Sequence, residues 1–407
     1  MHISLDSAIG QQRRLNQVGE TINSIAAPAA AYSLRSLTGG DPLVVRVRRE
    51  SDNTERDFTA SGVNSGALVD FVNRILTVGT AVNGTGSVDN YTVTGASTTG
   101  FSADNSAGGT GSAGFPYTFA DDDVIVVRYT VTNFSSTSSL SPQIRGVSAI
   151  NSTTGKTNAG TAFTANGTYT DTLTATADGT HLMFADGNTG SYTISDFEIV
   201  SHSSNGFVET WYDQSGNGND VTQTTSSKQP KIVNSGSLVT VNSKASFKFD
   251  GTDDCLNRAT HTQGALSQPN TAFAVAKLDA NDDQNRKVFD GDVATARHML
   301  QLNTTGNGQF AHFAGTVATT GEDADANRHL FTCLFNGSSS RLRIDSTQKS
   351  TSTTGSNAMN GIVIGANHDT IQNFWDGDIQ EVIFFSSDQT SNFAAIEANI
   401  NSHYSIF

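Results

Sequence analysis

Short segments in which polar and apolar residues alternate recur along most of this 407-residue chain, and turn residues separate them. VIVVRYTV (124–131) and YTDTLTA (169–175) are typical. Alternation with a period of two indicates half-buried strands, and strands of 6–9 residues between Gly, Asn and Asp turns indicate antiparallel sandwiches. Apolar residues make up 36% and charged residues 15%, with 38 Gly, but alternating strands need a core to face, which argues against disorder. We therefore predict an all-β fold.

The charge pattern argues against nucleic-acid binding. The net charge is −15, and a nucleic-acid site would need a clustered basic face. The densest basic stretch, Arg46, Arg48 and Arg49, lies beside Glu50, Asp52 and Asp57. Such alternation favours a salt-bridged strand pair over a phosphate site.

Two further patterns bear on compartment. Cys255 and Cys333 lie in apolar strand-like sequence without metal-ligand spacing, which predicts buried free thiols rather than a disulfide. The first residues lack the basic and then apolar pattern of an export signal. The sequence also contains no run of 18 apolar residues, so we expect no membrane span.

Three segments carry a resemblance. RVRRESDNTERD (46–57) and FVETWYDQSGNGN (207–219) resemble stretches of the family-54 arabinofuranosidase-type sandwich and of phage virion proteins that reuse it. The ending FWDGDIQEVIFFSSDQTSNFAAIEANINSHYSIF (374–407) resembles the final strand and helix of laminin-G and concanavalin-A-like sandwiches. In the family the first two segments lie close together, whereas here a Thr-, Gly- and Ser-rich stretch with its own strands separates them.

This separation predicts the domain organisation. Residues 31–74 and 204–407 would form a concanavalin-A-like jelly-roll sandwich, and 75–203 an inserted sandwich that resembles carbohydrate-binding modules. AYSLRSL (31–37) and PLVVRVRRES (42–51) are expected to form a turn-broken strand pair, and 65–75 a helical turn. Residues 1–30 are predicted to be a helical arm with an apolar stripe that ends at Pro28. Its docking partner is either its own sandwich or another virion subunit.

The resemblance also implies a retaining mechanism with two carboxyl groups. Asp369 in IVIGANHDTIQNFWDG occupies the place of the family's acid. The stretch that matches the nucleophile region holds Asn303, Thr304 and Asn307 but no carboxylate, and Arg286, Lys287 and Val288 replace the family's Cys-Cys pair. We therefore expect no catalysis, with Asp369 vestigial. The candidate glycan-binding residues are His368, Asp369, Trp375 and Asp376.

The YDQSGNGND turn (212–220) could be functional, but a rigid structural turn is the favoured interpretation. Asp213, Gln214 and Asn217 can bind backbone groups, and Gly216 permits a positive φ.

Acidic clusters suggest Ca²⁺ as the one candidate cofactor. Asp279, Asn281 and Asp283 have the spacing of a calcium loop, but Gln284 stands where Gly is needed, and a solvated turn is the default. DGTDD (250–254) and ADDD (120–123) are shorter clusters with the same default.

These observations predict a non-catalytic bacteriophage virion surface protein, such as a head decoration, fibre or tail appendage. It would assemble in the host cytoplasm, attach to other virion proteins through the arm, form a homo-oligomer (a trimer is favoured) and bind a host surface glycan. The alternatives are an arabinofuranosidase-like glycoside hydrolase or glycan depolymerase, and a secreted lectin.

Overall fold

The computed structural model shows a mostly β chain in two compact units. It describes residues 21–73, 75–76, 78–83, 92–106, 111–119, 123–135, 140–146, 160–186, 190–201, 204–280, 284–304, 308–370 and 372–407. Residues up to Val69 together with Asn205–Phe407 form one unit, the discontinuous unit. Asp70–Ser204 form the other, the central unit. The sequence placed the corresponding boundaries at 75 and 203.

The first sheet of the discontinuous unit is built around its longest strand. In this sheet β31 pairs antiparallel with β22, which continues through β27 and β28 to β29. Along its other edge, β31 pairs with β20 at its beginning and with β1 at its end. The strands are β1 (Ala30–Ser33), β20 (Phe247–Asp250), β22 (Asn270–Leu278), β27 (Arg328–Phe335), β28 (Arg341–Ile344), β29 (Thr347–Thr351) and β31 (Asp376–Phe385).

The second sheet runs in the order β26-β25-β24-β23-β30-β21-β15-β14-β2-β3. Its strands are β2 (Leu43–Arg49), β3 (Glu55–Thr59), β14 (Gly206–Trp211), β15 (Val221–Thr222), β21 (Leu256–Arg258), β23 (Arg286–Asp290), β24 (Met299–Asn303), β25 (Gln309–Phe313), β26 (Val317–Asp323) and β30 (Ile362–Ile364). The short strand β16 (Lys231–Asn234) pairs with both β14 and β20, so it joins the two sheets at one edge. Two short additions, β17 (Ser237–Leu238) on β16 and the β18–β19 hairpin (Thr240–Val241 and Lys244–Ala245), follow it.

Aromatic contacts between the sheets form the sandwich core. The Trp211 ring of β14 lies 4.6 Å from Phe247 of β20, and the Phe289 ring of β23 lies 5.1 Å from Phe384 of β31. All four side chains are at most 2% exposed. Burying such rings contributes roughly 2–3 kcal/mol each, so this interface holds the two sheets together.

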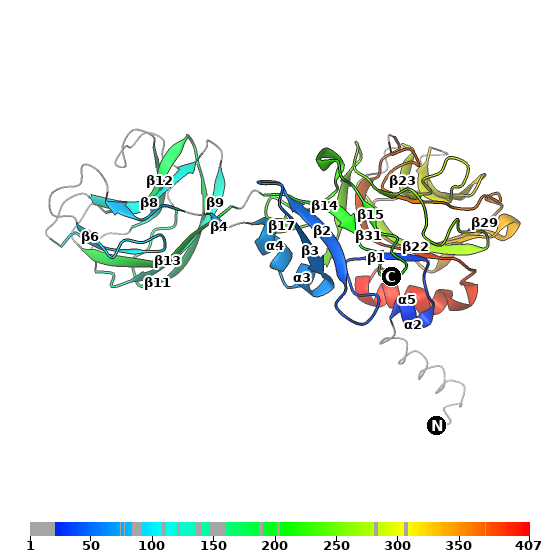
Figure 1. Cartoon of the computed structure of the whole chain (residues 1–407), viewed down its shortest axis with the longest axis horizontal. Coiled ribbons are helices and arrows are strands. Elements are labelled where there is room, and N and C mark those ends of the chain that lie inside the picture. Colours follow the sequence, from blue (N-terminus) through cyan, green and yellow to red (C-terminus); the bar gives the residue numbers. More distant parts are fainter. Residues whose placement is uncertain are drawn as a thin grey trace, which may run out of the picture. The chain divides into compact units, whose positions relative to one another are not determined.

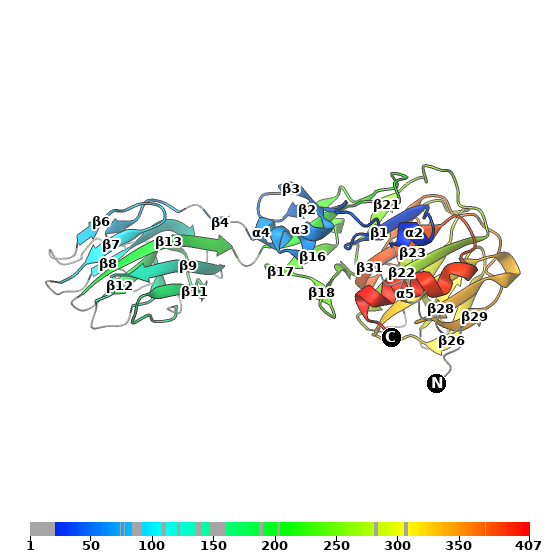
Figure 2. The same ribbon diagram turned by 90° about the horizontal axis from the view of Figure 1, so that it is seen from below.

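Helix α5 (Phe393–Tyr404) covers the outer face of the first sheet (Figures 1 and 2). Because side chains alternate along β31, Phe384 faces the sandwich core while Ile383 contacts Ile396 and Ile400 in a separate apolar cluster. The short helix α2 (Ile22–Ile25) joins this cluster through Ile22. The predicted C-terminal helix is thus confirmed. Of the predicted arm, only residues 21–30 lie in the described part of the chain.

The two motifs of the resemblance are side by side. β14 pairs with β2, with Trp211 opposite Val45, and the Tyr212 hydroxyl donates to Asp57 at 2.7 Å. The expected pairing of the two segments at 31–37 and 42–51 is wrong, because β1 pairs with β31 and β2 pairs with β3 and β14. The pairings of β1 with β31 and of β2 with β14 join distant parts of the chain, which local patterns do not encode.

The central unit is a second pair of antiparallel sheets. One has the order β10-β12-β8-β5, and the other β11-β9-β13-β7-β6, with β4 added to β13. Their aromatic core includes the stacked pair Phe115–Phe197, with ring centroids 3.8 Å apart. The strands are β4 (Ile75–Leu76), β5 (Val82–Asn83), β6 (Thr92–Thr94), β7 (Phe101–Asp104), β8 (Gly111–Phe119), β9 (Val124–Thr132), β10 (Pro142–Gly146), β11 (Gly167–Thr174), β12 (Gly179–Asp186) and β13 (Ser191–Ser201).

The remaining helices are short. The helical turn expected at 65–75 appears as α4 (Ala67–Val72), preceded by α3 (Ala60–Asn64) with Thr59 as its N-cap. Single 3-10 turns occupy Ser226–Lys228, Gly337–Ser339 and Thr390–Asn392. Within the described residues, no helix combines the length and hydropathy needed to cross a membrane. Both cysteines are buried and free, as predicted.

Candidate functional site

The YDQSGN turn after β14 is bound to the backbone of residues 28–37. Its side chains form hydrogen bonds with backbone amides and carbonyls in strand β1 and in the residues on either side of it. Asp213 Oδ1 accepts from the Ala31 amide at 2.8 Å, Gln214 Oε1 accepts from the Leu37 amide at 2.8 Å, and Asn217 Nδ2 donates to the Pro28 carbonyl at 3.1 Å. Gly216 has a φ of +84°. These contacts give the turn a structural use.

The glycan-binding candidates lie around the connection from β30 to β31. His368 and Asp369 are half-buried in a turn, and Asp376 opens β31 next to Arg286, 3.7 Å away. Trp375 has no exposed surface, so it cannot present a ring face to a sugar. These residues are near one another in the sequence, but they do not form a shared binding face that includes Trp375.

The region that the sequence resemblance matched to the family's catalytic centre contains a buried carboxyl group, Asp290. Asp290 is fully buried, accepts from Arg297 Nε at 3.1 Å and accepts from the His368 amide at 3.0 Å. Burial raises the pKa of Asp290, while the guanidinium of Arg297 opposes the rise. Asn303 and Thr304 lie at the end of β24, and Asn307 lies outside the described residues. Asp290 is thus engaged in fixing this connection.

The predicted calcium loop is described only in part. Asp279 follows β22 and forms ion pairs with Lys248 and, at 3.8 Å, with Lys277. Asn281 and Asp283 lie outside the described residues. Calcium binding at this loop stays a prediction.

A cavity of about 950 Å³ opens elsewhere in the discontinuous unit. Strands β2, β14, β16 and β20 and the 3-10 turn at Ser226–Lys228 form its wall. Its charged and aromatic lining includes Arg48, Phe207, Lys231, Asp250 and Asp254. A pocket of this size, with a few convergent polar groups, has the usual dimensions of a ligand site.

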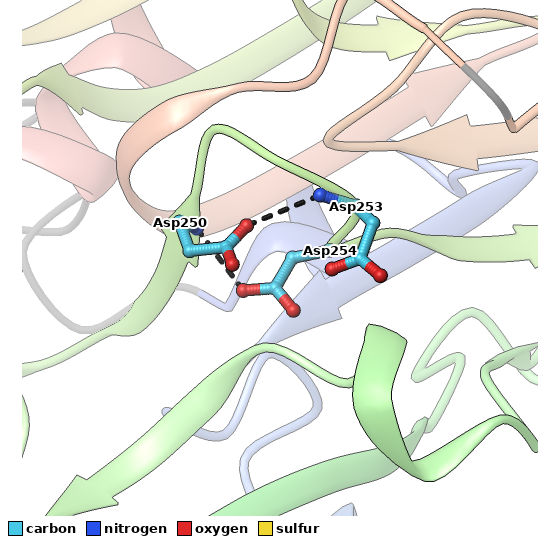
Figure 3. Close-up of side chains that lie close together, drawn as sticks. All are labelled: Asp250, Asp253 and Asp254. Carbon is cyan, nitrogen blue, oxygen red and sulfur yellow. Dashed lines mark hydrogen bonds between the residues drawn. The ribbon is translucent and has the colours of Figure 1, made fainter.

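Three carboxyl groups gather on one loop (Figure 3), and those of Asp250 and Asp254 line this cavity. Asp250, Asp253 and Asp254 each place one oxygen within 4.8 Å of the others. The loop is held by its own backbone, because Asp254 Oδ2 accepts from the Asp250 amide at 3.0 Å and Asp250 Oδ1 accepts from the Thr252 amide at 2.8 Å. Gly251 in the turn has a φ of +72°. Among the described residues, this is the one set of three acidic or ligand-type side chains close enough to hold a metal ion.

Asp254 differs from its neighbours in burial. It is 6% exposed, whereas Asp250 is exposed and Asp253 half-buried. Burial, and then the negative charge of Asp250, raise the pKa of Asp254 from 3.8 to about 8. A pKa raised in this way favours the protonated form of Asp254, which could donate a proton into the cavity.

The sequence analysis did not identify Asp250 and Asp254 as a site, because DGTDD (250–254) has the composition of a solvated turn. The available signal was position: Asp254 immediately precedes the buried Cys255 and Leu256 at the start of β21, where a side chain turns inward. The basic stretch was also only partly understood. Arg46 pairs with Asp57 at 2.7 Å and Arg49 with Asp52 at 2.8 Å, as expected, but Arg48 turns into the cavity wall.

Comparisons with known proteins return structures but no sequence family. No family model and no curated protein matches the chain. An arabinofuranosidase complexed with arabinofuranosyl-alpha-1,2-xylobiose is 12% identical with a TM-score of 0.46, over 91% of this chain and 62% of that one. Trypanosoma rangeli sialidase in complex with the inhibitor DANA is 11% identical with a TM-score of 0.33, over 48% and 30%. A Limulus polyphemus SAP-like pentraxin is 11% identical with a TM-score of 0.26, over 38% and 80%.

The chain thus spans less than two thirds of the arabinofuranosidase and of the sialidase. The prediction that the chain is not an enzyme is corrected here, because the structures that these comparisons return include an arabinofuranosidase and a sialidase; at 11–12% identity the likeness assigns no activity to this chain. The virion role stays a prediction that these comparisons do not support.

Proposed function

We propose that this chain is a glycoside hydrolase whose acid and nucleophile are Asp254 and Asp250. The observation that carries the proposal is a buried carboxyl group with a raised pKa beside a second carboxyl group on the wall of a 950 Å³ cavity. Cleavage of a glycosidic bond requires two carboxyl groups in different environments, so that one is protonated and the other is ionised.

The spacing favours the retaining route. The closest oxygens of the pair lie within 4.8 Å, whereas inverting enzymes separate their carboxyl groups by about 6.5–9.5 Å to admit a water molecule. Asp254 would protonate the glycosidic oxygen as its bond to the anomeric carbon breaks, and a carboxylate oxygen of Asp250 would bond to that carbon. Asp254, now ionised, would then take a proton from the water that releases the sugar.

Asp253 provides a matched control because it lies on the same loop and does not line the cavity. The purified chain is incubated with arabinan, arabinoxylan, homogalacturonan, alginate and a sulfated galactan, and released reducing ends are measured. We expect release from at least one of them. Asp254→Asn should lower that rate by about 10²–10⁴-fold, because general acid catalysis contributes about that much. Asp253→Asn should change it less than about threefold.

The folded state of each variant is verified by circular dichroism. No release from any of the five polysaccharides, or equal rates for Asp254→Asn and the unmodified chain, would contradict the proposal.

A further inference from the structure

Arg48 is a buried cation on the wall of the cavity that holds Asp254. It lies in β2, is 8% exposed and contributes to the cavity lining. Burial lowers its pKa from the ordinary value, but a guanidinium stays charged in any protein environment. A charge in such a position normally needs a partner of opposite sign.

The groups that hold Arg48 are neutral. Its Nε donates to Gln229 Oε1 at 2.7 Å, its Nη1 to Asn53 Oδ1 at 2.9 Å and its Nη2 to the Ser226 carbonyl at 3.2 Å. Gln229 is itself oriented, because its Nε2 donates to the Gln223 carbonyl at 2.7 Å. A guanidinium has five N–H donors, so one on Nη1 and one on Nη2 have no partner among the residues that the structure describes.

No carboxylate among the described residues forms an ion pair with Arg48. Glu50 and Glu55 act on it through space, yet neither is joined to it by a salt bridge. On the same strand, Arg46 and Arg49 each have a paired carboxylate. Arg48 is thus the member of this basic stretch that is built into the cavity wall without a carboxylate in direct contact among the described residues.

Two neighbours complete this end of the cavity. The Arg48 guanidinium lies 4.8 Å from the centroid of the Phe207 ring, and the Lys231 ammonium lies 5.9 Å from the same centroid. The ring supports the guanidinium plane through a cation–π contact. Lys231 adds a second positive charge, also on the cavity wall.

We propose that the cavity takes an anionic sugar unit, whose carboxylate or sulfate group binds Arg48 and Lys231 while an adjoining glycosidic bond lies at Asp254 and Asp250. The substrate class is therefore an acidic polysaccharide. This inference rests on the proposed function for its cleavage step, but the binding step is separable from it.

Binding is measured by calorimetry with the Asp254→Asn chain, which keeps the cavity and removes turnover. The probes are oligosaccharides of galacturonate, mannuronate and glucuronate, their neutral methyl esters, and a sulfated galactan oligosaccharide. We expect at least one acidic probe to bind about tenfold or more tightly than its neutral counterpart, because a hydrogen bond to a charged group is worth that much. Comparing the uronate probes with the sulfated probe shows whether the cavity binds a carboxylate or a sulfate group.

The added substitution Arg48→Gln should remove this preference. Arg46→Gln removes the same charge from the same strand outside the cavity and should leave the preference intact. If Arg48→Gln does not fold, Lys231→Gln replaces it and should weaken acidic probes about threefold or more.

Equal affinity for acidic and neutral probes, or a preference that survives Arg48→Gln, would overturn the inference. Cleavage of neutral polysaccharides alone would overturn it while leaving the proposed hydrolase intact. Acidic binding that depends on Arg48, without cleavage by the unmodified chain, would support the inference and contradict the hydrolase.

Discussion

The two units differ in the ion pairs that they bury behind similar strands. In the discontinuous unit, Arg35 pairs with Glu381 at 2.8 Å and Arg343 pairs with Glu397 at 2.8 Å, with both carboxylates at most 2% exposed. The ion pair Arg128–Glu198 of the central unit is exposed at its surface. Its core is instead a cluster of aromatic rings around Phe184.

This difference distinguishes the central unit from the discontinuous unit, which contains the candidate site. Aromatic packing needs only apolar surface and gives a sandwich that closes on itself. Buried charges must be satisfied by specific partners, and those partners come from distant segments, as with Arg35 and Glu381. The same unit contains the 950 Å³ cavity with its unpaired arginine and raised carboxyl pKa. Among the described residues, buried ion pairs therefore mark the unit in which we place the function.

A pH dependence confined to the discontinuous unit is among the largest expected effects. The pKa of Asp254 is about 8 when folded and about 3.8 when unfolded, so between these values the folded state holds the extra proton. Stability is thus greatest at low pH and falls as pH rises through this window. The unfolding free energy of the unmodified chain should fall by up to about 4 kcal/mol more than that of Asp254→Asn between pH 5 and pH 8. Denaturant titrations at both pH values measure this difference, and parallel curves would contradict it.

Glu381→Ala should destabilise the discontinuous unit by about 3–5 kcal/mol, because it leaves Arg35 buried and unpaired. The matched change, Glu198→Ala, breaks an exposed pair in the central unit and should cost less than about 1 kcal/mol. Calorimetry of the whole chain records both. Similar losses for the two variants would remove the contrast between the units.

Phe184→Ala should destabilise the central unit by about 3 kcal/mol, through lost burial and the cavity left among the rings. The transition of the discontinuous unit should not move. Tyr117→Ala, at the half-buried edge of the same cluster, should cost less. A shift of both transitions by Phe184→Ala would show that the units do not unfold separately.

The smallest effect is expected from removing the central unit. Replacing residues 76–203 by a short Gly/Ser linker should change the unfolding free energy of the discontinuous unit by less than about 1 kcal/mol, since each unit has its own core. The shortened chain should keep a β-type circular dichroism spectrum. Loss of that spectrum would refute the proposal that 75–203 is an inserted domain.

The sequence predicted the elements better than it predicted the site. Alternation identified VIVVRYTV as β9, and the ending identified β31 and α5. The pairing of β1 with β31 could not be predicted from the sequence, because it joins residues some 350 positions apart and no local pattern encodes it. Asp254 and Arg48 were read as a turn residue and a strand-pair charge. Their burial and their shared cavity arise only when β2, β16 and β20 come together.

The protonation of Asp254 is the central claim, and a carboxyl-carbon NMR titration measures it most directly. Comparison of the unmodified chain with Asp254→Asn assigns the signal, and Asp253→Asn shows that neighbouring signals are not mistaken for it. We predict a titration midpoint near pH 8 for Asp254. A midpoint near the ordinary value of about 4 would show that Asp254 is ionised at neutral pH and would contradict its role as the acid.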